Sequence, residues 1–243
     1  MKNKTPYVVA CAVLALDIKY AAEELGTEVG TKFLEGGLHN RPNLLREKLQ
    51  AAIDEISASG RCDRIIIGYA ICCRGTVGIQ SRDIPLAVPK VHDCIALFLG
   101  GDAAYRREFK KYPGTYYISA GWYEEKTEPH SQLKRSSYYV DEKLNYDEMV
   151  EKLGKEAAEE TFKFLSTWQK NYQRAAFIET GAKRSPKYEK YAREMAREYD
   201  WTYEKISGDP ILIEKLLTAD QTTAEIQEIG RASCWVSVGV WGG

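Results

Sequence analysis

Three cysteines and two histidines lie where strands of the predicted fold end. They are Cys11, His39, Cys72, His92 and Cys94, and each follows a short apolar run and precedes a helix-like segment. In an open α/β sheet the carboxyl ends of the strands border one crevice, where ligands bind. Thiol and imidazole groups that meet there can hold a soft metal ion or an iron–sulfur cluster. The pattern therefore predicts one site assembled from distant parts of the chain.

Cys11, Cys72 and Cys94 are the predicted metal ligands, with an iron–sulfur cluster or zinc as the predicted cofactor. Three thiolates would leave one coordination position open to a small-molecule substrate, with His92 or His39 near it. Cys94 follows Asp93, a good helix N-cap, so the partial positive charge of the helix start would favour a thiolate. The cysteines are far apart in the chain, and such spacing is less specific than paired CxxC motifs.

A second interpretation needs no metal. Cys72 or Cys94 would act as a nucleophile that transfers a methyl or sulfur group, and His92 would be the general base. Cys72 and His92 are thus the candidate catalytic residues. A structural role, as a small residue at a tight turn and as a hydrogen-bonding histidine, stays open for each of them.

Three further residues are candidates for holding a ligand or cofactor. His39 lies in a glycine-rich turn, Arg41 begins a helix, and Trp122 follows the fifth strand. An arginine at a helix start can bind a carboxylate or phosphate, and a tryptophan can stack on a planar ligand. A capping turn for His39 and Arg41, and a core position for Trp122, are the structural alternatives.

Apolar runs and helical periodicity alternate along the chain. The predicted strands are Tyr7–Leu14, Glu28–Leu34, Ile65–Ile71, Ile84–Val91, Thr115–Ala120, Arg174–Ile178 and Thr202–Ile206. The predicted helices are Ile18–Leu25, Pro42–Ser57, Cys94–Lys111, Asp147–Gln169, Pro186–Tyr199 and Pro210–Leu217. The pattern predicts an α/β fold, a three-layer sandwich with a mostly parallel sheet that could consist of two similar halves.

Two segments of this predicted fold are irregular. Pro85 and Pro89 predict that the strand Ile84–Val91 is an edge strand or mostly irregular, because proline cannot donate to a sheet. Tyr123–Asn145 is polar and without a clear period, so we expect a long connection there. Residues 1–227 as a whole are predicted to form a single α/β domain.

Composition limits the possible partners. The chain has 243 residues, of which 44% are hydrophobic and 28% charged, with a net charge of -1. This balance gives no support for nucleic acid as a partner, so we expect a small-molecule ligand. The apolar run before Cys11 is too short for a signal peptide, and no stretch is long enough to span a membrane. Six cysteines grouped at strand ends suit a reducing compartment, and we expect a cytoplasmic protein.

The segment 228–243 is anomalous. It begins EIGRASC and continues WVSVGVWGG, without a pattern that extends the domain. The heptapeptide is what reading through a sequencing adapter would encode. We therefore expect the natural reading frame to be lost near Glu228.

Four motifs together resemble one known family. They are LEGGLHNRP, DRIIIGYAICCRGTVG, VPKVHDCIALFLG and PGTYYISAGW. They are similar to the domain of unknown function DUF1638, and the resemblance covers about Tyr7 to Leu217. It singles out the residues Cys11, Cys72, His92 and Cys94, the turn from His39 to Pro42, and the pair Gly121-Trp122. The chain departs from the usual motif at Cys73, where the family has glycine.

The resemblance implies little about activity beyond a shared fold. Its members are associated with anaerobes that use corrinoid-dependent methyl transfer, which suggests anaerobic one-carbon metabolism and a corrinoid methyltransferase system as a partner. A third interpretation follows, in which the protein is a non-catalytic module that binds a corrinoid or metal for a methyltransferase.

Overall fold

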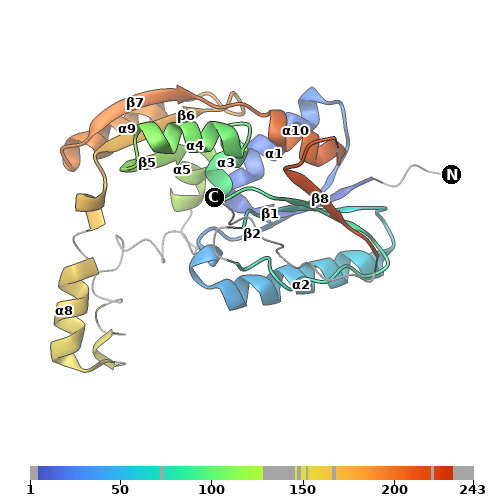
Figure 1. Ribbon diagram of the computed structural model, residues 1–243, viewed down its shortest axis with the longest axis horizontal. Coiled ribbons are helices and arrows are strands. Elements are labelled where there is room, and N and C mark those ends of the chain that lie inside the picture. The colour runs from blue at the N-terminus through green and yellow to red at the C-terminus, as the bar shows by residue number, and fades with distance from the viewer. Residues whose placement is uncertain are drawn as a thin grey trace.

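Two β-sheets form the framework of the protein in its computed structural model (Figure 1). The structure describes residues 5–71, 74–127, 146, 149–151, 153–165, 168–219 and 222–231. The first sheet has the strand order β2-β1-β3-β4-β8, and the second has the order β5-β6-β7. Every pair is parallel except β4 with β8. The predicted mixed α/β fold with mostly parallel strands is confirmed, and its strands are divided between two sheets.

The elements agree closely with the sequence pattern. The strands are β1 (Tyr7–Cys11), β2 (Gly30–Leu34), β3 (Ile65–Gly68), β4 (Leu86–Pro89), β5 (Thr115–Ser119), β6 (Arg174–Glu179), β7 (Thr202–Ser207) and β8 (Ile226–Ile229). The α-helices are α1 (Ala15–Glu24), α2 (Pro42–Ser59), α3 (Cys94–Phe98), α4 (Asp102–Lys111), α5 (Ala120–Thr127), α8 (Lys155–Leu165), α9 (Pro186–Glu198) and α10 (Ile211–Thr218). The short 3-10 helices are η1 (Ala12–Leu14), η2 (Leu38–Asn40) and η3 (Trp168–Asn171).

The first sheet is covered on both faces. Every residue of β3 is buried, as a continuous apolar run predicts for a central parallel strand. Helix α2 lies along one face, and α1 and α10 lie on the other (Figure 1). Leu45, Leu49 and Ile53 are fully buried, and their spacing places them on one side of α2. Burial of apolar surface on both faces therefore fixes the central strands.

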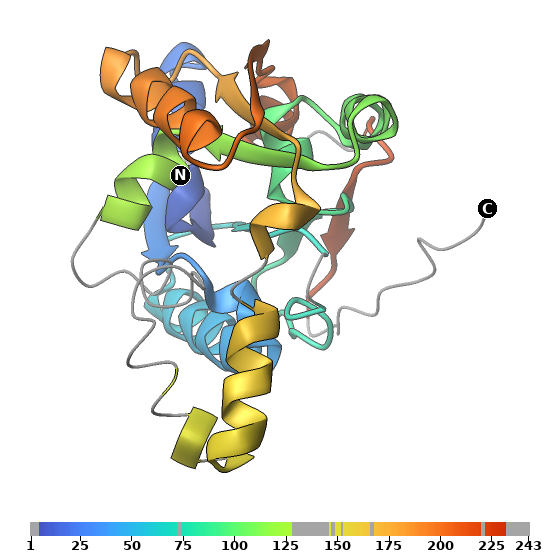
Figure 2. The same cartoon turned by 90° about the vertical axis from the view of Figure 1, so that its left-hand side faces the viewer.

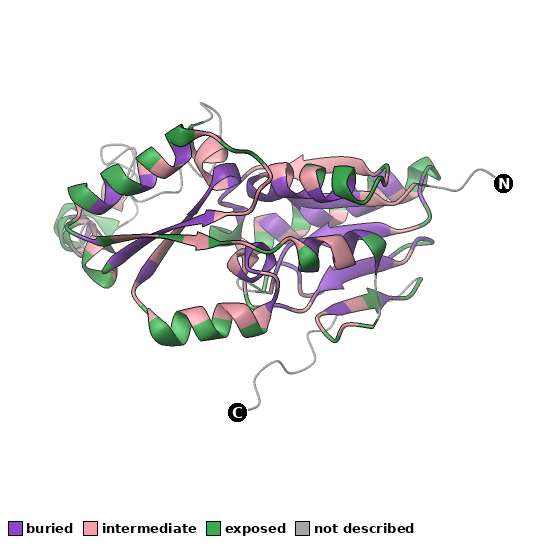
Figure 3. Ribbon diagram, turned by 90° about the horizontal axis from the view of Figure 1, so that it is seen from above, coloured by how far each residue is buried: buried purple, intermediate pink, exposed green. Residues whose placement is uncertain are grey.

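The second sheet has its own hydrophobic core. Helix α9 packs on β6 and β7 and buries Tyr188, Ala192 and Met195 against the sheet residues Ile118 and Phe177. Buried residues follow the strands and the inward faces of the helices (Figure 3). Helix α8 extends away from both sheets (Figures 1 and 2).

The prediction of an edge position for the strand near Ile84–Val91 is wrong. Strand β4 pairs with β3 on one side and with β8 on the other. The prolines are tolerated because Pro85 precedes the strand and Pro89 is its last residue, so neither removes a donor from the middle of the ladder. Proline therefore marks the two ends of this strand rather than an edge.

The predicted helix Cys94–Lys111 is in fact two helices. Gly100 and Gly101 have φ angles of +85° and +145°, which no continuing α-helix allows. The carboxylate of Glu225 then accepts a hydrogen bond of 2.6 Å from the backbone N–H of Asp102, at the start of α4. The two glycines thus turn the chain between α3 and α4.

Two other boundaries differ from the prediction. The polar connection Tyr123–Asn145 begins as helix, because α5 continues to Thr127; residues 128–145 lie outside the described part of the chain. Within the predicted helix Asp147–Gln169, α8 begins at Lys155. The residue before it, Gly154, has a φ of +80°. Polar composition alone did not exclude a helix in α5.

The first residues of the anomalous segment take part in the fold. Strand β8 includes Glu228 and Ile229, which pair with Ala87 and Leu86 of β4. The expectation that residues from 228 onward continue no element of the domain is therefore wrong for these two positions. Residues 232–243 lie outside the described part of the chain.

We call the first sheet with α1, α2, α3 and α10 the first lobe, and the second sheet with α4, α5 and α9 the second lobe. The start of α5 packs on η1 so closely that a Cβ on Gly121 would overlap the carbonyl oxygen of Val13. The carboxylate of Glu125 accepts a hydrogen bond of 2.8 Å from the backbone N–H of Gly36. Helix α5 therefore holds the second lobe against the carboxyl ends of β1 and β2.

A buried carboxyl group lies near the same junction. Asp17 of α1 is 3% exposed, and neither of its oxygens makes a hydrogen bond of normal geometry. Burial raises the pKa of Asp17 to about 6, and a weaker polar contact with the hydroxyl of Thr180, after β6, offsets part of the rise. The first lobe therefore keeps a buried ionisable group close to Thr180 of the second.

No helix in the described ranges is long and apolar enough to cross a membrane. The cytoplasmic location stays a prediction.

Gly121→Ala tests the contact between the lobes. The added methyl group meets backbone that cannot rotate away, so we expect a loss of about 1–3 kcal/mol in the free energy of unfolding. Thermal melts followed by circular dichroism measure it. Gly114→Ala is the control, because its Cβ would lie 3.3 Å from the nearest atom, the carbonyl oxygen of Asn171. Equal melting temperatures for the two variants would contradict the tight contact.

Asp17→Asn tests the buried carboxyl group. Because the pKa of Asp17 is raised in the folded state, its contribution to stability is full below about pH 4 and is lost as the pH rises through about 6. We expect the variant to be more stable than the parent at pH 8, on the order of 2 kcal/mol, and to match it near pH 4. Urea unfolding at both pH values measures this, and a difference that does not change with pH would refute it.

Candidate functional site

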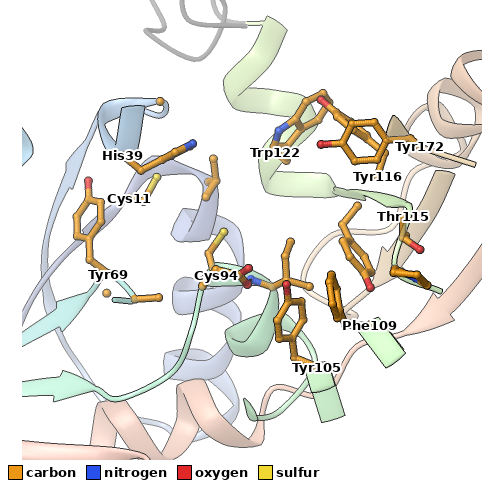
Figure 4. Close-up of a pocket in the computed structure, with 18 residues that line it drawn as sticks. Cys11, His39, Tyr69, Cys94, Tyr105, Phe109, Thr115, Tyr116, Trp122 and Tyr172 are labelled. Carbon is orange, nitrogen blue, oxygen red and sulfur yellow. The ribbon is translucent and has the colours of Figure 1, made fainter. Parts of the chain in front are cut away.

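A cavity of about 410 Å³ lies between the two lobes (Figure 4). Its floor is formed where β1, β3 and β4 end, and its opposite wall comes from α4, β5 and the start of α5. A cavity of this size suits a small molecule. The carboxyl ends of the strands thus border a ligand-sized space, as the sequence predicts for an open α/β sheet.

Two thiols reach this cavity from separate strand ends. Cys11 is the last residue of β1, and Cys94 is the first residue of α3 after β4. Asp93 fixes the start of α3, because its carboxylate accepts a hydrogen bond of 2.9 Å from the backbone N–H of Ile95. The imidazole of His39 lies on the same side of the cavity (Figure 4). Two thiols and one imidazole are therefore brought to one side of the cavity.

Both thiols are held in the protonated form. Burial raises the pKa of Cys11 to about 12, the charge of Glu125 adds to the rise, and hydrogen bonds from the Val13 backbone and the Tyr69 side chain oppose it. Burial, and then the charge of Asp93 and the neighbouring Cys11, raise the pKa of Cys94. A backbone hydrogen bond at Cys94 lowers this pKa, but burial outweighs it, so the thiolate predicted at the helix start is not favoured.

Aromatic side chains line most of the opposite wall. Tyr116, Trp122 and Tyr172 stand together across the cavity from His39 and Cys11 (Figure 4). The lining aromatic residues are Tyr69, Tyr105, Phe109, Tyr116, Tyr117, Trp122 and Tyr172. The cavity therefore has one side with thiol and imidazole groups and another side with aromatic rings.

The structure brings together four of the predicted site residues. Cys11, His39, Cys94 and Trp122 all line the cavity. His39 is exposed as a residue, yet desolvation of its ring at the cavity lowers its pKa. Cys72 lies outside the described residues, and its role stays a prediction.

Two predicted residues lie elsewhere. Arg41 is exposed at the N-terminus of α2 and does not line the cavity. His92 is also exposed, with Nδ1 3.2 Å from an oxygen of Asp93 and its ring stacked on Tyr105 at 5.8 Å between centroids. His92 therefore contacts Asp93 and Tyr105, and it is not among the residues that line the cavity.

Sequence reasoning missed most of the aromatic wall and the place of Asp93 in the cavity. Asp93 was interpreted only as a helix cap, although a cap beside a strand end also faces the crevice. The signal for the wall was the 16 tyrosines of the chain, two of which are adjacent in the strand motif PGTYYISAGW. Nothing in the sequence placed α4 across from the thiols.

Within the described ranges, no group of three or more His, Cys, Asp or Glu side chains is arranged to hold a metal ion. Cys11, Cys94 and His39 share one cavity without forming such a group. A metal ion at this site would therefore require movement of these side chains or a further donor.

Slow alkylation is expected for the cavity thiols. The pKa of Cys11 is raised from 9.0 to about 12, so its thiolate fraction at pH 8 is about 1000-fold below that of an unfolded chain. The protein is labelled with iodoacetamide at pH 8, once in native buffer and once in urea. Peptide mass spectrometry then gives the ratio of Cys11 labelling in the two conditions. Equal labelling of Cys11 in both conditions would contradict the buried, protonated thiol.

Comparison with protein families identifies the relatives of this chain. No curated protein and no solved structure matches it. A family model described as "Protein of unknown function (DUF1638)" matches residues 33–217, which is most of the chain and confirms the resemblance. The chain therefore belongs to the DUF1638 family.

Proposed function

We propose that the protein binds a thiophilic metal ion at Cys11 and Cys94, in a cavity that also admits a small-molecule ligand. The observation that carries this proposal is the arrival of two thiols from separate strand ends in one ligand-sized cavity. His39, on the same side, supplies an imidazole as a third soft donor. Metal binding would draw these three side chains together.

The protonated state of the thiols favours a metal over a free cysteine nucleophile. A thiol with a pKa of about 12 supplies almost no thiolate near neutral pH. A coordinating metal ion displaces the thiol proton outright, which releases that proton to solvent. The alternative of a metal-free methyl or sulfur transferase would have to rely on Cys72, whose environment is outside the described residues.

Zinc is favoured over an iron–sulfur cluster. Clusters are commonly held by four cysteine thiolates, whereas two thiols and one imidazole suit a single zinc ion with an open position. Such an ion would supply Lewis-acid or thiolate chemistry to a ligand in the cavity. Anaerobic one-carbon metabolism, and a corrinoid methyltransferase system as partner, are the first context in which to seek that ligand.

Metal content of the protein made and purified without oxygen tests the proposal. We expect bound zinc without acid-labile sulfide, and Cys11→Ser and Cys94→Ser should each weaken metal binding by more than about 10-fold. Cys62→Ser is the matched control, because Cys62 is a buried cysteine that does not line the cavity. Circular dichroism checks that each variant is folded.

Each outcome has a distinct meaning. Full metal content in folded Cys11→Ser and Cys94→Ser would refute the proposal, as would a parent protein that takes up no metal. Iron together with sulfide would replace zinc by a cluster. Turnover of a ligand would separate an enzyme from a non-catalytic module that carries a metal or corrinoid to a methyltransferase.

A further inference from the structure

The charged side chains that line the described part of the cavity give it a net negative charge. Among the described lining residues there is no lysine or arginine, and Asp93 supplies the one carboxylate. A divalent metal ion held by two thiolates and the neutral imidazole of His39 would add no net charge to this lining. A ligand with a carboxylate or phosphate would therefore find no lysine or arginine on the described part of the wall.

Asp93 lies beside the aromatic residues of the cavity. It lines the cavity next to Cys94, and the ring of its neighbour His92 stacks on that of Tyr105 at 5.8 Å between centroids. One carboxylate oxygen accepts from the backbone N–H of Ile95 and the other lies 3.2 Å from Nδ1 of His92, which leaves the carboxylate further acceptor positions. The described lining therefore combines one carboxylate with several aromatic rings.

The aromatic wall favours the same kind of ligand. The ring of Tyr105 lies 6.0 Å from that of Phe109 and 6.5 Å from that of Tyr117, between centroids, and all three line the cavity. Aromatic faces attract cations, most strongly where water is excluded. Trp122 already has the ammonium of Lys126 5.0 Å from its centroid, and Lys126 itself does not line the cavity. An aromatic ring of the second lobe that lines the cavity, Trp122, thus already has a cation near its face.

We propose that the ligand of this cavity is a small organic cation with methylated nitrogen or sulfur, an inference that rests on the proposed function of the cavity as a ligand site. Its methyl groups would pack on Tyr105, Phe109 and Tyr117, and its charge would face Asp93.

Three probes of similar shape and different charge test the ligand class. Tetramethylammonium, tert-butanol and pivalate carry positive, zero and negative charge on nearly the same apolar body. Binding to the full protein is measured by saturation-transfer NMR and titration calorimetry at pH 7. We expect tetramethylammonium to bind about tenfold or more tightly than tert-butanol, and pivalate to bind least.

Asp93→Asn isolates the role of the carboxylate. Asparagine remains a good N-cap for α3, so the fold should be kept while the charge is removed. The preference for tetramethylammonium over tert-butanol should fall several-fold in this variant. Asp83→Asn is the control, because Asp83 is an exposed aspartate outside the cavity, and it should leave the preference unchanged.

Three results would overturn the inference: pivalate or tert-butanol binding as tightly as tetramethylammonium, no saturable binding of tetramethylammonium, or an unchanged preference in folded Asp93→Asn. Metal content is measured on the same samples. Metal binding without cation preference would reject this ligand class and leave the metal proposal standing. Cation preference without metal would reject the metal and keep the ligand class.

Discussion

The close contact between the start of α5 and η1 is the constraint on which the site depends. The cavity has one side in the first lobe and the other in the second, so it exists only while the lobes are held together. Gly121 permits that contact, because any side chain there would enter the space of the Val13 carbonyl group. Val13 follows Cys11 by two residues, so the same contact orders the segment that presents a thiol. The same contact therefore determines both the packing between the lobes and the geometry of the site.

Burial gives the site its chemical character. The thiols lie under the second lobe, where loss of solvation outweighs every group that would stabilise a thiolate. The same enclosure places Asp93 beside aromatic rings without a neighbouring lysine or arginine in the described lining. A protein that protects thiols in this way favours ligands that replace the proton, such as a soft metal ion, over direct attack by a free thiolate.

Local sequence signals predicted the elements well, and their failures have physical causes. The apolar run of β3 and the helical spacing of α2 identify these elements because each buries a continuous surface. Pro85 and Pro89 were misleading because proline is equally compatible with a strand end and a strand edge. The polar composition of α5 concealed a helix whose stability comes from contact with η1 and from Glu125 on Gly36.

By itself the sequence determined the α/β class, most of the strands and helices, the family, and the placing of Cys11, His39 and Cys94 at strand ends. These follow from local periodicity and from the rule that parallel strands end at one edge of a sheet. Only the tertiary structure decided that the strands form two sheets and that an aromatic wall faces the thiols. It also placed Asp93 in the cavity and left His92 and Arg41 outside it. Such outcomes depend on packing between segments about a hundred residues apart, and no local pattern encodes which face of α4 or β5 meets the first lobe.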